Sequence, residues 1–214
     1  MNRIVERFTR LQQQGQKGFI VYIGAGDPDL EVTRQLALAF DAVGVDVLEL
    51  GVPFSDPLAD GLVNQLAAQR GLESGTTPPE VLETVAAIRQ DSTMPIVLYI
   101  YFNLVHRHGL QKFIQDAARA GVDGLLVLDL PPEEAGPYEQ LMRAEGVCNI
   151  YLVAPTTPDD RIERIVKQAA GPHSPNTMPP SAGPITRARL NCIEFIATAF
   201  GTSSRRTSSG RSDA

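Results

Sequence analysis

The sequence predicts an α/β protein in which parallel strands alternate with helices and curve into part of a barrel. Three observations lead to this fold class. Five short apolar runs alternate with longer segments of helical periodicity. The runs are apolar throughout, which is typical of parallel strands that are buried on both faces. Acidic and turn-forming residues follow the runs, at the strand ends where parallel α/β folds place their functional groups.

The first two elements begin this alternation. Residues 2–14 are expected to form a helix, because Ile4, Phe8 and Leu11 recur at helical spacing. The apolar run 19–23 is expected to form the first strand, and it stops at a turn-rich stretch that runs from Gly24 to Pro28. No Gly-x-Gly-x-x-Gly nucleotide fingerprint follows this strand. A barrel is therefore favoured over an open nucleotide-binding sheet.

The same alternation continues along the chain. Each further strand is an apolar run, and each is followed by a segment of helical periodicity. Strands are expected at residues 45–52, 96–102, 125–130 and 150–154. Helices are expected at residues 30–43, 62–72, 79–90, 110–120, 132–145 and 158–170.

Two of these units resemble each other. In residues 42–53 and again in residues 118–131, a helix ends at a glycine and a strand begins after an aspartate, Asp46 or Asp123. An acidic residue then stands near the end of each strand, with a proline beyond it. Alternating units of this kind form either an open doubly wound sheet or an eight-fold barrel. The missing nucleotide fingerprint decides in favour of a TIM (β/α)8-type barrel.

The barrel pattern stops before eight units are complete. Five β/α units can be counted over residues 1–171, which are expected to form a partial TIM-barrel domain. Residues 172–214 begin with a proline-rich stretch that excludes a helix or a central strand. Their last 13 residues are mostly Ser, Thr, Arg and Gly. This second segment is expected to be a disordered tail.

Composition narrows the class of protein. The 214 residues, 43% of them hydrophobic, suit one globular domain, and the net charge of −6 argues against nucleic acid as the main partner. No apolar run approaches the roughly 20 residues that a membrane helix needs. Cys148 and Cys192 lack the spacing of a disulfide framework or a zinc site. The charged N-terminus lacks the apolar core of a signal peptide, so a cytoplasmic location is predicted.

Two acidic residues are the strongest candidates for chemistry. Glu49 lies inside an apolar run, where burying an unpaired charge costs roughly several kcal/mol. Asp60 follows on a proline-bent loop, an arrangement that suits two carboxylates flanking a small substrate with different pKa values. Structural alternatives stay open at this point. Glu49 could pair with an interior Lys or Arg, and Asp60 could cap the helix that follows it.

Several other polar residues are interpreted as structural. Asp27, which precedes Pro28, is expected to cap a helix. His106 and His108 are expected at a helix start on the solvated surface, because no carboxylate or cysteine stands near them in the sequence. The alternative for the tyrosines at 22 and 101 is that both are ordinary core aromatics.

The run from Leu48 to Gly61 closely resembles the signature of the tryptophan synthase alpha chain family. The resemblance extends from residue 1 to about 171 and includes residues 26–28, Tyr101 with residues 103–105, and residues 129–131. It implies a TIM barrel that cleaves indole-3-glycerol phosphate to indole and glyceraldehyde 3-phosphate without a metal or organic cofactor. It also implies a pyridoxal phosphate-dependent beta chain as the partner, in an alpha2-beta2 heterotetramer.

The resemblance also implies roles for individual residues. Glu49 resembles the catalytic acid/base, and Asp60 resembles the residue that hydrogen-bonds the indole N–H and stabilises the protonated ring. The residues expected around the indole are Tyr22, Ile100, Tyr101 and Leu126. Asp129 is expected either to contact the substrate or to supply supporting hydrogen bonds. Pro53 and Asp56 are expected to belong to the interface with the beta chain.

Residues 172–214 do not resemble the family's continuation. The family continues with a tyrosine-bearing sixth strand, a mobile Gly-Val-Thr-Gly-type loop and two further strands whose glycine-rich loops bind the substrate phosphate. These motifs are not found in residues 172–214, and a frameshift or truncation after about residue 171 is the expected cause. The alternative function is therefore a non-catalytic remnant that lacks the phosphate site and is at most a beta-chain-binding module.

Overall fold

The computed structural model describes residues 2–153 and 157–170. They form one parallel sheet whose strand order follows the sequence, β1-β2-β3-β4-β5. The strands are β1 (Ile20–Gly24), β2 (Val47–Gly51), β3 (Ile96–Ile100), β4 (Gly124–Val127) and β5 (Cys148–Ile150). The predicted parallel α/β fold is confirmed by this sheet. The predicted disordered tail, residues 172–214, lies outside the described residues.

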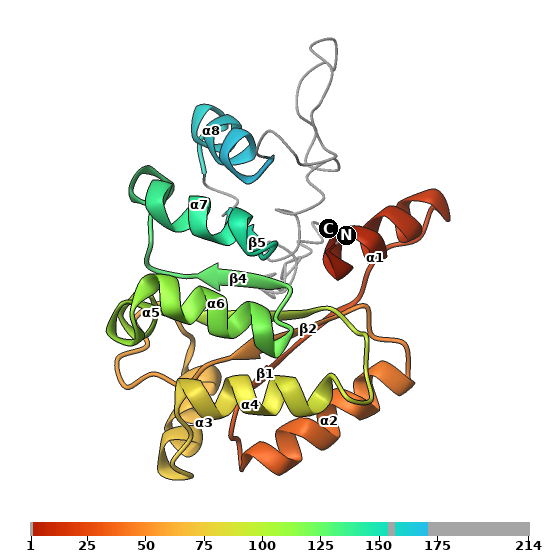
Figure 1. The fold of residues 1–214 in the computed structure, drawn as a ribbon, viewed down its shortest axis with the longest axis vertical. Coiled ribbons are helices and arrows are strands. Elements are labelled where there is room, and N and C mark those ends of the chain that lie inside the picture. Colours follow the sequence, from red (N-terminus) through yellow and green to blue (C-terminus); the bar gives the residue numbers. More distant parts are fainter. Residues whose placement is uncertain (1, 154–156, 171–214) are drawn as a thin grey trace, which may run out of the picture.

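Helices connect the strands (Figure 1). They are α1 (Arg3–Gln13), α2 (Leu30–Ala42), α3 (Leu62–Glu73), α4 (Pro78–Ile88), α5 (Phe102–His108), α6 (Leu110–Ala120), α7 (Gly136–Ala144) and α8 (Asp159–Ala170), with a short 3-10 helix η1 at Pro132–Glu134. The short helix α5 was not predicted, because the apolar run of β3 continues into it. The predicted helix 132–145 divides into η1 and α7, since Pro137 at the start of α7 lacks the N–H that an uninterrupted helix would need.

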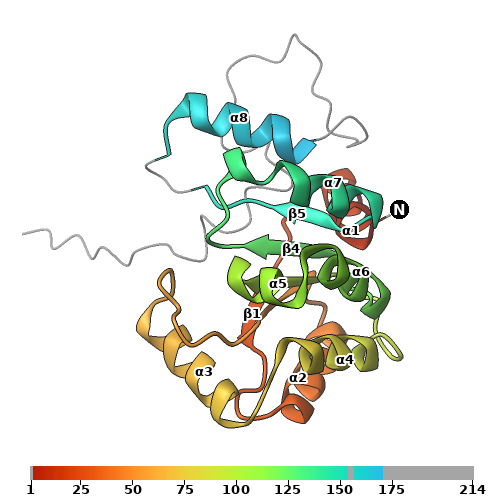
Figure 2. The ribbon, with the colours of Figure 1, turned by 60° about the vertical axis from the view of Figure 1, so that its left-hand side comes forward.

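The two faces of the sheet have different neighbours. On the outer face, Leu48, Leu98 and Leu125 belong to a large core shared with α2, α4, α6 and α7, which follow one another along that face (Figure 1, Figure 2). On the inner face, Val47 and Val97 pack with Ile4 and Phe8 of α1. Because side chains alternate between the faces, burial of both explains why each strand is apolar throughout.

The two ends of the sheet are occupied by different helices. A Cβ placed on Gly124, at the start of β4, would meet the side chain of Ile4 on α1. A Cβ placed on Gly24, at the end of β1, would meet Ala67 on α3. Figure 1 and Figure 2 both show α1 and α3 far apart, on opposite sides of the sheet. The amino ends of the strands are therefore covered by α1, and the carboxyl ends face α3 and the loop before it.

The repeat seen in the sequence has a structural explanation. Asp46 and Asp123 stand directly before β2 and β4. The Asp46 carboxylate accepts a hydrogen bond from the N–H of Phe19, just before β1, at 2.7 Å. The Asp123 carboxylate accepts one from the N–H of Ile96, the first residue of β3, at 2.9 Å. Each carboxylate also binds an arginine of α1, Arg7 or Arg3. The two aspartates thus fix adjacent strands to each other and to α1.

The prediction for the two histidines is wrong in part: His106 is exposed, as expected, but neither residue begins a helix and His108 is not on the solvated surface. His106 and His108 lie in the last turn of α5, not at a helix start. His108 is half-buried, and its Nε2 lies 2.8 Å from Asp116 and 3.0 Å from the Lys112 amine, both on α6. Because α5 and α6 meet at Gly109, the fold brings these groups together across eight residues of sequence.

In the part of the chain that the structure describes, none of the helices combines the length and the apolar character that a membrane crossing would require.

Candidate active site

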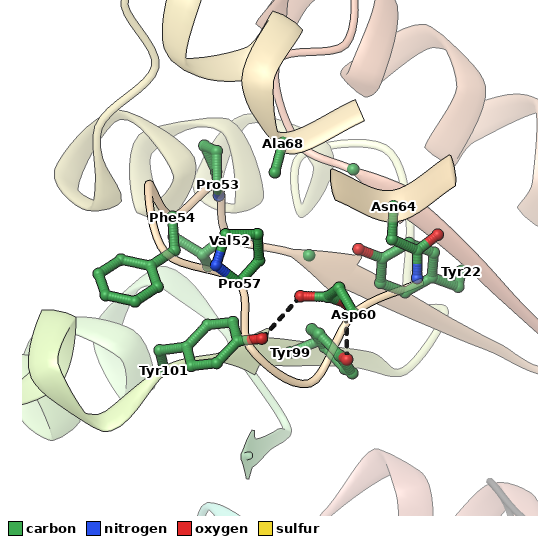
Figure 3. A pocket seen from close by; sticks show the side chains of 12 residues that line it. Tyr22, Val52, Pro53, Phe54, Pro57, Asp60, Asn64, Ala68, Tyr99 and Tyr101 are labelled. Atoms are coloured by element: carbon green, nitrogen blue, oxygen red, sulfur yellow. Dashed lines mark hydrogen bonds between the residues drawn. The ribbon is translucent and has the colours of Figure 1, made fainter. Parts of the chain in front are cut away.

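A small pocket lies at the carboxyl ends of β1, β2 and β3, where the loop from β2 to α3 folds back over the strands (Figure 3). Strand ends of this kind are where parallel α/β folds hold their functional groups. The residues that line the pocket are Tyr22, Gly24, Gly51, Val52, Pro53, Phe54, Pro57, Asp60, Asn64, Ala68, Tyr99 and Tyr101.

Glu49 lies in the middle of β2, with Tyr22 beside it on β1 and Val97 beside it on β3. It shares the inner face with Gly51 of the pocket lining, two residues further along the strand, but does not itself line the pocket. Burial raises the pKa of the Glu49 carboxyl to about 7, with no contribution from a neighbouring cation. The alternative of an interior Lys or Arg partner is therefore wrong within the described residues.

Asp60 is held at both of its carboxylate oxygens. The Tyr99 hydroxyl donates to Oδ1 and the Tyr101 hydroxyl donates to Oδ2, each at 2.8 Å (Figure 3). The N-cap of α3 is Gly61, which makes no side-chain capping bond, so the interpretation of Asp60 as a helix cap is wrong. The carboxylate faces the strands instead, where the two phenols fix its orientation.

Tyr101 also fastens the loop to β3. Its hydroxyl accepts a hydrogen bond from the Ala59 N–H at 3.0 Å, next to the bond that it donates to Asp60. Its ring stacks on Phe54 with the ring centroids 4.8 Å apart. The loop is thus attached to one side chain at its beginning and at its end, which limits where Asp60 can lie.

Tyr22 connects the two carboxylates electrostatically. Burial, and then the charges of Asp60 and Glu49, raise the pKa of the Tyr22 phenol above its ordinary value. Its hydroxyl lies over Gly51, where a Cβ would approach the hydroxyl oxygen to 2.3 Å, so the absence of a side chain at 51 makes room for it. Tyr22 thus lies beside Glu49 in the strand register and lines the same pocket as Asp60.

Tyr99 lines the pocket, whereas the residue predicted from the sequence is its neighbour Ile100. Ile100 is fully buried on the outer face, in the core formed with the helices, so its predicted place beside the indole is wrong. Tyr99 points inward, its ring edge-on to Tyr22 at 5.3 Å. The alternation of strand side chains contains the signal, because a residue on the same face as Tyr101 must lie two positions away.

Leu126 and Asp129, two other residues expected near the substrate, lie in different environments. Leu126 lies beside Tyr99 in the strand register and packs on the inner face, as the expectation of an apolar wall requires. Asp129 is exposed beyond β4, and its Oδ1 accepts a hydrogen bond from the Phe102 N–H at 2.6 Å. This contact fixes the start of α5, which fits the supporting role that was one of the two interpretations of Asp129.

Asp27 and Asp56, the other two acidic residues of the nearby loops, lie outside the pocket lining. Asp27 forms a two-pronged ion pair with Arg70 of α3, both bonds at 2.8 Å, and this hydrogen bonding lowers the pKa of the Asp27 carboxyl. The N-cap of α2 is Asp29, so the capping role predicted for Asp27 is wrong although its role is structural. Asp56 is exposed on the loop, whereas Pro53 is buried in the pocket wall.

Comparisons with known proteins identify relatives of this chain. The family model described as tryptophan synthase alpha chain matches residues 8–172. A curated tryptophan synthase alpha chain from Opitutus terrae is 53% identical over 171 residues, which is 80% of this chain and 64% of the relative. The chain spans about 64% of the length of the curated relatives that it matches.

Solved structures give the same result. Tryptophan synthase subunit alpha from Legionella pneumophila superposes with a TM-score of 0.77 at 40% identity, covering 80% of this chain and 66% of that chain. The tryptophan synthase a2b2 complex from Pyrococcus furiosus contains a chain with a TM-score of 0.69 at 40% identity, covering 72% of this chain and 65% of that chain. The described residues thus form five β/α units of a TIM barrel.

Proposed function

Because the chain belongs to the tryptophan synthase alpha chain family, we propose that it cleaves indole-3-glycerol phosphate to indole and glyceraldehyde 3-phosphate. The observation that supports the proposal is that Tyr22 of the pocket pairs in the sheet with Glu49, a largely buried carboxyl with a pKa of about 7, while two phenols hold the pocket carboxylate Asp60 in place. Retro-aldol cleavage needs both a group that can give and take protons and a fixed negative charge.

Glu49 is the proton carrier of the proposed reaction. In the cleavage, the ring carbon that bears the side chain gains a proton, and the carbon–carbon bond electrons return to the ring. The hydroxyl of the adjacent side-chain carbon loses its proton and becomes the carbonyl of the aldehyde, so the net change is a proton moved from oxygen to carbon. With a pKa of about 7, Glu49 is present in both forms near neutral pH and can serve both transfers.

Asp60 is the fixed anion of the proposed reaction. Protonating the indole ring at carbon creates a cation whose charge is shared with the ring N–H. A carboxylate that already points into the site stabilises this cation without having to reorient. The hydrogen bonds from Tyr99 and Tyr101 supply that orientation, and each carboxylate oxygen keeps a lone pair for the substrate N–H.

The test is to incubate the purified protein with indole-3-glycerol phosphate and to measure indole and the aldehyde product. Glu49→Gln should lower the rate at least about 100-fold, because the amide cannot transfer the proton. Glu83→Gln makes the same charge change at an exposed position of α4 and should retain the wild-type rate. Absence of indole above the buffer blank with wild-type protein would reject the proposal.

A second candidate function is docking on a pyridoxal phosphate-dependent beta chain, with or without catalysis. The loop that carries the exposed Asp56 leads into three apolar side chains, Leu58, Leu62 and Val63, which are 95%, 71% and 77% exposed. Exposed apolar side chains next to a charged loop are typical of a protein interface. The relative from Pyrococcus furiosus is part of an a2b2 complex.

Calorimetric titration with a purified beta chain tests this second function. The wild-type protein should bind, and Leu58→Asp should weaken the affinity at least about 10-fold, because it places a charge in an apolar contact. Leu152→Asp, at an exposed apolar residue beyond β5, is the matched control and should bind like the wild type. Equal affinities of the wild type and Leu58→Asp would exclude this surface.

A further inference from the structure

Two phenols near the end of β3 hold the two oxygens of one carboxylate. Tyr99 lies in β3 and Tyr101 is the extended residue that follows the strand, so both side chains lie on the inner face, about 7 Å apart along the chain. Their hydroxyls donate to Oδ1 and Oδ2 of Asp60, each at 2.8 Å. Both oxygens of the carboxylate are therefore bound, which stops rotation of the carboxylate about its own axis.

We propose that Tyr99 is a positioning residue of the active site, which acts through Asp60 by fixing the orientation of its carboxylate. The inference rests on the proposed function, since orientation matters only if Asp60 meets a substrate. It gives Tyr99 a role that differs from the loop attachment provided by Tyr101. Tyr101 fastens the loop through Ala59 and Phe54 as well as Asp60, whereas the hydrogen bond of the Tyr99 hydroxyl goes to Asp60.

The surroundings of Tyr99 suit the role of positioning the Asp60 carboxylate. The residue is 4% exposed, and its ring packs edge-on against Tyr22 on one side, so the hydroxyl has little freedom. Burial, and then the hydrogen bond to Asp60, raise the pKa of the Tyr99 phenol above its ordinary value. The phenol therefore remains a protonated donor at any pH at which the enzyme would work. A donor that is rigid and always protonated can hold an anion in one orientation.

Removing the Tyr99 hydroxyl would leave Asp60 held by one bond. The carboxylate could then turn about the contact with Tyr101 and point its free oxygen away from the ring N–H. The loop would stay in place, because Tyr101 still binds Ala59 and stacks on Phe54. Loss of orientation without loss of the loop predicts a fall in turnover with little change in substrate binding.

The first experiment is a double-mutant cycle with Tyr99→Phe and Asp60→Asn, assayed with indole-3-glycerol phosphate. Tyr99→Phe should lower kcat about 10- to 100-fold and leave KM within about 3-fold, because a hydrogen bond to a charged group is lost. In the Asp60→Asn background the same change should lower kcat less than about 3-fold, since the group it acts through is gone. Equal effects in both backgrounds would mean that Tyr99 acts only on general packing, and would overturn the proposal.

Tyr138→Phe is the matched control. Tyr138 is a buried tyrosine of α7 whose hydroxyl has no hydrogen-bond partner among the described residues, and it lies in the outer core. Removing its hydroxyl makes the same chemical change without touching the site, so kcat and KM should match the wild type. A loss of kcat here equal to that of Tyr99→Phe would show that any buried hydroxyl has this effect, which would also overturn the proposal.

A second measurement is independent of turnover. Protein labelled with 13C at the tyrosine ζ carbon gives one signal per phenol, which single Tyr→Phe variants assign. Asp60→Asn should move the signals of Tyr99 and Tyr101 and leave that of Tyr138 in place. If the two signals move but the wild type makes no indole, the proposed function fails while the carboxylate contact stands. If the Tyr99 signal does not move, the positioning proposal fails whatever the activity.

Discussion

Replacing Asp123 by asparagine is expected to lower the free energy of unfolding by about 3–5 kcal/mol, the usual loss when one partner of a buried ion pair is removed. The Asp123 side chain is 3% exposed and binds Arg89 at 2.7 Å and Arg3 at 2.8 Å. Its Oδ2 also accepts the Ile96 N–H at 2.9 Å. The neutral amide would leave the largely buried Arg89 guanidinium without its counter-charge.

Urea unfolding followed by far-UV circular dichroism measures this loss. Asp160→Asn is the matched control, because its ion pair with Arg164 lies on the surface at 3.5 Å with both side chains about 70% exposed. An exposed pair of this kind contributes at most about 1 kcal/mol. A loss below about 1 kcal/mol for Asp123→Asn would mean that water or a shifted side chain replaces the carboxylate.

Replacing Glu49 by glutamine is expected to stabilise the protein at alkaline pH while it removes the proposed activity. The folded state raises the pKa of this carboxyl to about 7 from its ordinary value of 4.5, so between these values the folded protein binds more protons than the unfolded chain. Stability then falls as the pH rises through this window and stays low above it. The penalty is absent below the unfolded pKa. Glutamine keeps the shape of the protonated form and carries no such penalty.

The expected gain from Glu49→Gln is roughly 1 kcal/mol at pH 5 and about 3 kcal/mol at pH 8, taking about 1.4 kcal/mol for each pKa unit. Urea unfolding at the two pH values gives both numbers. Glu83→Gln, at an exposed site on α4, removes the same charge and should follow the wild type at both pH values. A gain that is the same at pH 5 and pH 8 would show that Glu49 does not titrate between them.

Asp123→Asn is expected to destabilise the protein and Glu49→Gln to stabilise it, and this difference has one cause. Burial, with no neighbouring cation in the described part of the chain, makes Glu49 costly to the fold and gives it a pKa suited to proton transfer at neutral pH. Asp123 is also buried, but two arginines and a backbone N–H bind it, so it contributes to stability. The contrast between the two acids separates a catalytic candidate from a structural one without reference to any relative.

Much of the fold could be predicted because its signals are local. Apolar runs and helical periodicity lie within about 15 residues of sequence, and they located the five strands of the described sheet. The strand ends were less well predicted, since 150–154 was expected where β5 is Cys148–Ile150 and 125–130 was expected where β4 is Gly124–Val127. The helix α5 was missed because β3 runs into it without a polar break.

The sequence by itself determined the alternation of strands and helices, the two carboxylates Glu49 and Asp60, and the family resemblance, since each is written in short stretches of the chain. The tertiary structure alone decided that the Tyr99 hydroxyl binds Asp60 and that His108 meets Asp116. It also decided that, among the described residues, no cation lies beside Glu49. The physical reason is that burial and contact depend on residues brought together by packing, as Asp60 and Tyr99 are across 39 positions of sequence.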